Sequence, residues 1–245
     1  MTSDERLIRI NKFLSEAGIC SRKQADRLIE QGEVEVNGQP AYLGMKIRET
    51  DQVSVSGRGI ESKPEPVYLL YHKPVGITCT HDLAVKGNLV DALDFPQRVF
   101  AVGRLDKASE GLMLLTNDGE IVNKILRVEN AHQKRYQVTV DKAITPAFLQ
   151  AMAAGVEILD TVTRPCQVSQ RSEDCFEIVL TQGLNRQIRR MCKALGYRVT
   201  RLRRLRIMHL ELDGLSEGEW RLLTPEERNQ LTLQLRDSSS LAKTL

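Results

Sequence analysis

The first sixty residues combine short amphipathic stretches with turn residues, a pattern that predicts a small module of helices and strands. A helix is expected over residues 9–17, and it ends at Gly18, a residue type common just after helix ends. Ser21 begins a second helix, because Gln24 stands three residues later in the capping-box pattern. This second helix ends at Gly32.

Strand-like alternation follows the helix pair. Residues 34–36 alternate as a short strand, Asn37-Gly38 is a strong tight-turn signal, and residues 52–55 form a second short strand. Residues 56–66, SGRGIESKPEP, are rich in Gly, Ser and Pro, which favours a linker, although a long surface loop has the same composition. Residues 1–63 are therefore expected to form one domain.

Beyond this segment the pattern is mainly that of strands. The expected strands cover residues 67–71, 99–102, 112–115, 136–140, 176–180 and 207–212. The expected helices cover residues 120–126, 146–153, 186–195 and 225–235. In two of them an N-cap threonine, Thr145 or Thr224, is followed by proline at the first helical position. Strands and helices without regular βαβ alternation predict an α+β domain over residues 64–235, with a frayed tail at 236–245.

Composition and ligand patterns narrow the possible classes. The chain has 245 residues, 41% hydrophobic and 27% charged, and no segment approaches the roughly 20 apolar residues of a membrane helix. Because the N-terminus has no apolar signal segment, we expect a cytoplasmic protein with no membrane partner. The five cysteines and four histidines show no ligand or redox spacing, so we expect reduced thiols and no metal.

Charge is distributed unevenly along the chain. The net charge of +3 says little, but residues 183–206 contain nine Lys or Arg and no Asp or Glu. Such a block can be a solvated surface, or it can bind a polyanion such as nucleic acid. Residues 1–63, by contrast, contain ten basic and ten acidic residues, so only clustering on helix faces could make that module bind RNA.

Three segments carry candidate chemistry, and each also has a purely structural interpretation. Asp106 lies in GRLDKASEGLMLLTNDG, where it could simply satisfy backbone N–H groups of a turn. Tyr136 begins a strand in KRYQVTV, where a half-buried core tyrosine is the commoner outcome. The segment LTQGLNRQIRRMCKALGY leads from a glycine turn into a helix whose arginines could form an ordinary exposed basic face.

Together these segments resemble the pseudouridine synthases, and within them the RsuA/RluB/RluF family, which acts on ribosomal RNA. The matching motifs are GRLDKASEGL, KRYQV, GLNRQIRRM and the segment YHKPVG at residues 71–76. Residues 9–57 resemble an S4 RNA-binding domain. The segments NKILR, GVEILDTVT, RIM and GEW are most similar to RluF-type members. The resemblance implies an S4 domain followed by a catalytic domain built on a mixed, mainly antiparallel sheet.

The resemblance also implies a reaction. Pseudouridine formation breaks the N1–C1′ bond of uridine, turns the uracil and joins its C5 to C1′, with no net redox change, so no cofactor is expected. It assigns the essential carboxylate to Asp106, as nucleophile or as base, by the same logic as a glycosidase carboxylate beside a cationic sugar carbon. It places Arg189 beside that carboxylate and stacks Tyr136 on the target base.

Further residues are expected to contact RNA. For the target nucleotide the resemblance implies Arg104, Leu105, Lys107, Asn185, Arg186, Gln187 and Ile188. For the S4 domain it implies Arg9, Lys12, Arg22, Lys23 and Arg27. The expected partner is ribosomal RNA, most specifically 23S rRNA of the large subunit or its assembly intermediates, bound by a monomer. A tRNA stays open as a second substrate.

Two other functions compete with this interpretation. A catalytically inactive rRNA-binding or ribosome-assembly protein could keep the fold, but such a paralogue should have lost Asp106, Tyr136 or Arg189, and all three are present. A glycoside hydrolase would need a second carboxylate, and it would leave the basic helix unexplained. The motifs therefore favour an isomerase.

Overall fold

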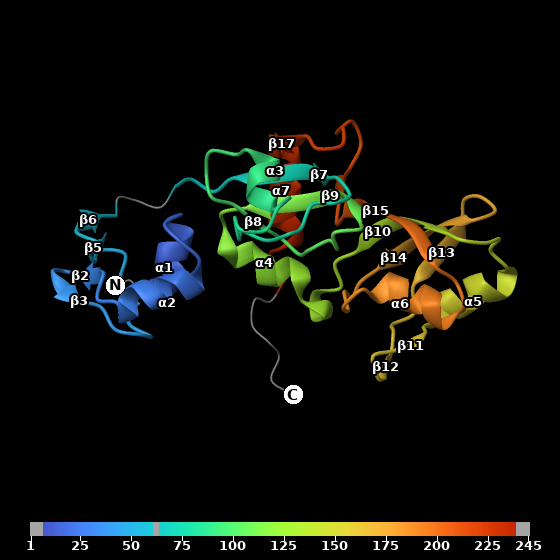
Figure 1. The fold of residues 1–245 in the computed structure, drawn as a ribbon, viewed down its shortest axis with the longest axis horizontal. Helices are drawn as coiled ribbons and strands as arrows, with labels where there is room; N and C mark the ends of the chain where they lie inside the picture. Colours follow the sequence, from blue (N-terminus) through green and yellow to red (C-terminus); the bar gives the residue numbers. More distant parts are fainter. Residues whose placement is uncertain (1–6, 61–63, 239–245) are drawn as a thin grey trace. The chain divides into compact units, whose positions relative to one another are not determined.

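The computed structural model describes residues 7–60 and 64–238, and its chain forms two compact units (Figure 1). The first unit comprises residues 1–66 together with residues 97–99. The second unit comprises residues 67–96 and 100–245. Each unit has its own hydrophobic core, and each is described by itself below.

The first unit packs two helices against short strands. Its helices are α1 (Ile10–Glu16) and α2 (Arg22–Glu30). Its strands are β1 (Ile8–Arg9), β2 (Val34–Val36), β3 (Gln39–Pro40), β4 (Lys46–Ile47), β5 (Val53–Val55) and β6 (Arg58–Gly59), which form a four-stranded sheet in the order β3-β2-β5-β6 and a separate β1-β4 pair. The predicted capping box is present, because Ser21 and Gln24 exchange side-chain and backbone hydrogen bonds.

Two tight turns define the sheet of the first unit. Asn37 and Gly38 both have positive φ, 52° and 76°, which confirms the predicted turn between β2 and β3. The linker expected at 56–66 is wrong for its first part. Ser56 and Gly57 form a second such turn, β6 pairs with β5, and Ile60 packs on the core of this unit. Gly and Ser favour a hairpin turn and a linker equally, so composition alone could not separate them; residues 61–63 lie outside the described residues.

The second unit is built on a nine-stranded sheet in the order β13-β14-β10-β15-β9-β7-β17, with β16 paired to β15 and β8 to β9. Its strands are β7 (Tyr68–Lys73), β8 (Phe100–Ala101), β9 (Glu110–Thr116), β10 (Lys134–Val140), β13 (Gln167–Gln170), β14 (Cys175–Leu180), β15 (Val199–Ile207), β16 (Leu210–Glu211) and β17 (Trp220–Leu222). Every pairing is antiparallel except that between β15 and β9. This confirms the expected α+β fold with a mainly antiparallel sheet. A separate hairpin joins β11 (Glu157–Ile158) and β12 (Thr161–Val162).

The second unit has two hydrophobic cores, and helices pack on both. The helices of this unit are α3 (Leu89–Leu93), α4 (Gly119–Leu126), the 3₁₀ turn Val128–Asn130, α5 (Pro146–Ala154), α6 (Gln187–Ala194) and α7 (Pro225–Gln234). Helices α5 and α6 share a core with β10 and β14, whereas α4 and α7 share one with β7 and β9 (Figure 1). Thr145 and Thr224 accept hydrogen bonds from the first turns of α5 and α7, as the Thr-Pro pattern predicted. None of the helices in the described ranges is both long and apolar enough to cross a membrane.

The main error of the sequence interpretation concerns the basic stretch before residue 207. A strand was expected at 207–212, but β15 covers Val199–Ile207 and the chain turns at Met208, whose φ is 54°. The strand VTRLRRLRI was not predicted from the sequence, because the hydrophobic pattern assigns its charged positions to the surface. In the structure Arg204 is buried between β10 and β9. The expected strand at 99–102 is only Phe100–Ala101, α3 was not foreseen, and residues 239–245 of the expected tail lie outside the described residues.

Candidate active site

The loop that carries Asp106 connects β8 to β9 and is fixed by backbone hydrogen bonds, one within the loop and one from Gly76. The N–H of Ser109 donates to the carbonyl of Asp106 at 3.0 Å, and the N–H of Gly76 donates to the carbonyl of Lys107 at 2.8 Å. Gly103 begins the loop with φ 78°, a conformation that favours glycine. The side chain of Asp106 is 37% exposed, so the loop presents a carboxylate that a ligand can reach.

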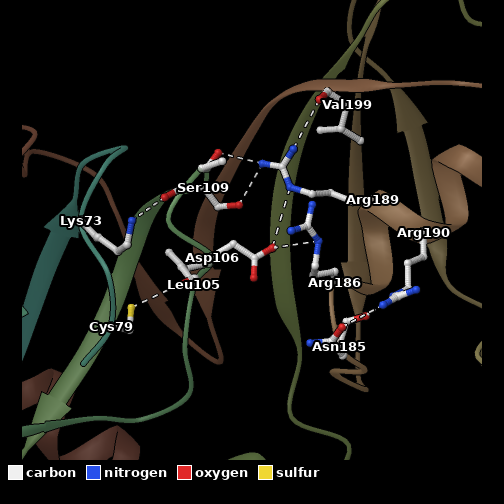
Figure 2. A network of polar contacts seen from close by, with 11 residues as sticks. Lys73, Cys79, Leu105, Asp106, Ser109, Asn185, Arg186, Arg189, Arg190 and Val199 are labelled. Carbon is white, nitrogen blue, oxygen red and sulfur yellow. Dashed lines mark hydrogen bonds and ion pairs between the residues drawn. The ribbon is translucent and has the colours of Figure 1, made fainter. Parts of the chain in front are cut away.

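Two arginines from the start of α6 approach this carboxylate (Figure 2). Nε of Arg189 lies 3.9 Å from Oδ2 of Asp106, and Nε of Arg186 lies 4.0 Å from the same oxygen. Arg189 is the better fixed of the two, because its side chain is 14% exposed against 54% for Arg186. Burial lowers the pKa of Arg189, while the charge of Asp106 raises it. The pair orients the carboxylate and places positive charge beside it.

Ser109 connects Arg189 and a buried lysine to the Asp106 loop (Figure 2). Nη2 of Arg189 donates to the carbonyl of Ala108 at 2.8 Å and to Oγ of Ser109 at 3.1 Å. Nζ of Lys73 donates to the carbonyl of Ser109 at 2.7 Å and to that of Pro74 at 2.8 Å. Lys73 is fully buried, and this burial lowers its pKa. Neither residue was predicted as a site residue, although the YHKPVG motif contains Lys73.

A close contact between β9 and β15 holds the far end of the loop. Gly111 has φ 111°, and a Cβ there would lie 2.3 Å from the carbonyl oxygen of Arg204 and 2.6 Å from its nitrogen. Arg204 is 2% exposed and donates from Nε to the carbonyl of Leu112 at 2.7 Å. Arg201 pairs with buried Glu110 at 2.7 Å. Only glycine permits this approach, so the backbone itself fixes where β9 leaves the loop.

Tyr136 lies in β10, opposite Arg204 of β15 and Ile178 of β14. Its ring is half-buried and packs against the core formed with α5 and α6, so the structural interpretation of this residue holds in part. Two residues earlier, Lys134 is 9% exposed, and burial together with the nearby charge of Arg204 lowers its pKa to about 8. Buried cations therefore lie on the strand of the tyrosine itself and on the neighbouring β15.

The remaining residues expected at the target nucleotide fall into two groups. Arg104, Lys107, Asn185 and Arg186 are exposed, and Asn185 accepts hydrogen bonds from Arg190 at 3.0 and 3.1 Å. The buried group is Leu105, Gln187 and Ile188.

In the buried group the side chains are covered by the protein itself, and the expected contact of these residues with the target nucleotide stays a prediction. Ile188 belongs to the core under α6, and Oε1 of Gln187 accepts from the N–H of Leu184 at 3.0 Å. Leu105 is 7% exposed, and its carbonyl lies 3.3 Å from Sγ of Cys79. These side chains shape the two loops from inside, because a motif lists neighbours in sequence without saying which way each one points.

Three of the five basic residues expected to bind RNA in the first unit line one pocket. Arg9, Lys12 and Arg22 line a pocket of about 310 Å³, together with Leu7, Ile8 and Asn11. Lys12 also pairs with Glu16 at 3.4 Å. Lys23 and Arg27 are exposed on α2 but do not line this pocket.

All five cysteines are free thiols, and across residues 7–60 and 64–238 no group of three or more His, Cys, Asp and Glu side chains could hold a metal ion. The candidate site is thus a partly exposed carboxylate beside two arginines, and the separate small unit carries a pocket lined by three basic residues.

The family follows from comparison with known proteins. Residues 67–194 match the RNA pseudouridylate synthase family, and residues 8–53 match the S4 domain family. The chain belongs to the pseudouridine synthases with an N-terminal S4 domain, in the RsuA/RluB/RluF family. It is therefore an isomerase, as the motifs predicted. The first and second units are called the S4 unit and the catalytic unit below.

Individual relatives support this assignment. The chain is 51% identical over 237 residues to the dual-specificity RNA pseudouridine synthase RluF of Salmonella typhi, covering 96% of this chain and 82% of the relative. It is 37% identical over 233 residues to the ribosomal large subunit pseudouridine synthase B of Bacillus subtilis (strain 168), covering 91% and 95%. A crystal structure of a pseudouridylate synthase matches with a TM-score of 0.67 and 29% identity over 91% of this chain and 99% of that one.

Proposed function

We propose that this enzyme converts specific uridines of 23S ribosomal RNA to pseudouridine, with Asp106 as the essential carboxylate and without a cofactor. The observation that carries the proposal is the position of Asp106, partly exposed and within 4.0 Å of Nε of both Arg186 and Arg189. The choice of large-subunit RNA is supported by the relatives, one of which is named a ribosomal large subunit synthase.

The chemistry accounts for a single carboxylate. The reaction moves one bond of uracil from N1 to C5 while the base stays bound, so no water has to be activated. Asp106 either attacks C1′ or removes a sugar proton. Both routes need an ionised and oriented carboxylate, and the guanidinium of Arg189 provides the orientation. Lys73 and Ser109 hold the loop so that this geometry exists before RNA binds.

The target uridine has to leave its helix to reach Asp106. Unstacking costs a few kcal/mol, and the half-buried ring of Tyr136 offers a surface on which the uracil can stack. Arg104 and Lys107 flank Asp106 in sequence, and Arg186, which follows Asn185, approaches it in space. All four residues are exposed and provide donors for the nucleotide and its phosphates. The S4 unit adds affinity through Arg9, Lys12 and Arg22.

A tRNA is the second candidate substrate. The observation that favours it is the 51% identity to an enzyme named dual-specificity RNA pseudouridine synthase. We further propose that the enzyme works as a monomer in the cytoplasm, on ribosomal RNA or on assembly intermediates of the large subunit.

The test is to map pseudouridine in total RNA from cells with and without this gene. Loss of at least one 23S site, restored by the wild-type gene and not by Asp106→Asn, is the expected result. Loss of a tRNA site in the same cells would establish the second substrate. If every 23S site persists in the deletion strain, the proposed rRNA function is wrong.

A further inference from the structure

A pocket lies on the face of the catalytic sheet opposite Tyr136. Consecutive residues of a strand point to opposite faces, so Arg135 points away from Tyr136 and from the core under α5 and α6. Arg203 of β15 pairs in register with Gln137 of β10 and shares the face of Arg135. The pocket has a volume of about 400 Å³, and it is lined by Arg135, Arg203, Leu205, Glu211, Leu212, Asp213, Gly214, Leu215 and Ser216.

The arginines around this pocket differ in their partners. Arg135 pairs with Glu211 at 2.9 Å, and Arg206 approaches the other oxygen of Glu211 at 3.7 Å, so one carboxylate serves two guanidinium groups. Arg201, two residues before Arg203 on β15, pairs with Glu110 at 2.7 Å. Within the described part of the chain the guanidinium of Arg203 has no hydrogen bond or ion pair, and its Nε is buried.

Such a group needs an acceptor. A buried donor without a partner costs free energy, and an arginine fork suits phosphate oxygens and the edges of bases. Among the lining residues the charges of Arg135 and Arg203 balance those of Glu211 and Asp213, and Asp213 lies exposed at the rim. Because Arg135 is already paired with Glu211, the guanidinium of Arg203 is the group in this pocket that favours an anion.

The size and walls of the pocket select the ligand further. Its volume lies in the range of about 300–1,000 Å³ that small-ligand sites have, which is more than a single phosphate fills. Leu205, Leu212 and Leu215 provide apolar wall, which a free phosphate would leave unused. A base with its phosphate uses both parts, because the base can lie on apolar side chains while Arg203 binds the phosphate.

We propose that this pocket binds one unpaired nucleotide of the substrate RNA, outside the stem-loop that contains the target uridine. Arg203 donates to its phosphate, and the base lies against the leucines. The inference rests on the proposed RNA function and extends it to the reverse face of the sheet. Single-stranded RNA that flanks the target then contributes affinity without taking part in the reaction.

The experiment compares a minimal target stem-loop with the same stem-loop carrying single-stranded extensions of about eight nucleotides at both ends. For the wild type we expect the extensions to tighten binding about tenfold. Arg203→Ala should remove most of that gain and reduce the salt slope for the extended RNA by about one unit. Its affinity for the minimal stem-loop and its single-turnover rate at saturation should not change.

Three controls accompany this comparison. Arg171→Ala removes an exposed arginine that pairs with Glu177 and does not line the pocket, and it should keep the full gain from the extensions. An extension of abasic residues keeps the phosphates but lacks bases, so it should recover only part of the gain. Arg203→Lys keeps the charge and controls for a folding defect. The unfolding temperatures of Arg203→Lys and Arg203→Ala are therefore both measured.

Three outcomes would overturn the proposal: no gain from the extensions in the wild type, equal losses in Arg203→Ala and Arg171→Ala, or an abasic extension that binds as tightly as the normal one. If the wild type forms no pseudouridine on the minimal stem-loop, the proposed function is contradicted instead. Failure of the pocket proposal and failure of the proposed function can therefore be told apart.

Discussion

The two units of this enzyme use their charged residues in opposite ways. The S4 unit keeps its cations at the surface, where Arg9, Lys12 and Arg22 line an open pocket. The catalytic unit buries charges in its interior, where Lys73 is 0% exposed and Arg204 is 2% exposed. Nζ of Lys73 donates to the carbonyls of Ser109 and Pro74, and Nε of Arg204 donates to the carbonyl of Leu112, so both buried cations bind the Asp106 loop or the strand that follows it.

The difference indicates a division of work. Exposed cations attract RNA over a distance, and salt screens that attraction. Buried charges contribute little to attraction, but they hold backbone and side chains in one arrangement because each misplacement leaves a desolvated charge without a partner. The catalytic unit should therefore control the rate of the chemical step, and the S4 unit should control affinity.

The largest expected effect is that of Asp106→Asn. Asparagine has nearly the same shape but cannot carry the negative charge, so single-turnover pseudouridine formation should fall by at least about a thousandfold. RNA affinity, measured by filter binding, should stay close to that of the wild type. Turnover by the pure variant, beyond slow deamidation to aspartate, would remove Asp106 from the mechanism.

Arg189→Ala should lower the single-turnover rate about a hundredfold at saturating RNA. The reason is that Asp106 loses its orienting partner, and the carbonyl of Ala108 and Oγ of Ser109 lose their donor. Arg189→Lys should rescue little, because lysine lacks the planar fork. Arg190→Ala is the matched control, since Arg190 lies on the same helix and contacts Asn185. A pure affinity defect in Arg189→Ala would contradict the comparison.

Gly111→Ala should destabilise the catalytic unit by about 2–3 kcal/mol. The new Cβ would overlap the backbone of Arg204, and φ at this position is unfavourable for alanine. Gly59→Ala, in the S4 unit, is the control, because a Cβ there meets nothing within 4 Å. Urea unfolding monitored by circular dichroism measures both. Equal stability of the two variants would show that β9 and β15 can separate at little cost.

Deletion of residues 1–63 should weaken binding to a long rRNA fragment by about ten- to a hundredfold while the saturated rate on a short stem-loop is retained. The S4 unit acts by raising the local concentration of RNA, so its loss should change affinity and site choice. The measurement is single-turnover kinetics over a range of enzyme concentrations. A folded but inert catalytic unit at saturation would mean that the S4 unit takes part in the reaction.

The smallest expected effect is that of EDTA, which should change neither the rate nor the affinity for a pre-folded stem-loop. Neither unit brings together a ligand cluster within its described residues, and the reaction needs no redox step. Activity is compared with and without chelator after the fold of the RNA has been checked. Activity lost with EDTA and restored by zinc or magnesium would reveal a metal requirement.

Local sequence determined those features whose energy depends on near neighbours. The capping box at Ser21, the turn at Asn37, the Thr-Pro helix starts and the motifs around Asp106 all follow from residues a few positions apart. For the same reason the α+β class and the order of the two units could be read from the chain. Family motifs added the identity of the carboxylate and of its arginine.

Only the tertiary structure decided which charged residues are buried and which face they take. Arg201, Arg203 and Arg204 are the same residue type within four positions of the chain. Yet Arg201 pairs with Glu110, Arg203 lines a pocket without a partner among the described residues, and Arg204 is buried on the strand between β9 and β10. The same holds for Gly111, whose missing side chain makes room for a strand more than ninety residues later in the chain. Burial and ion pairing depend on contacts between distant segments, and these contacts exist only once the sheet has formed.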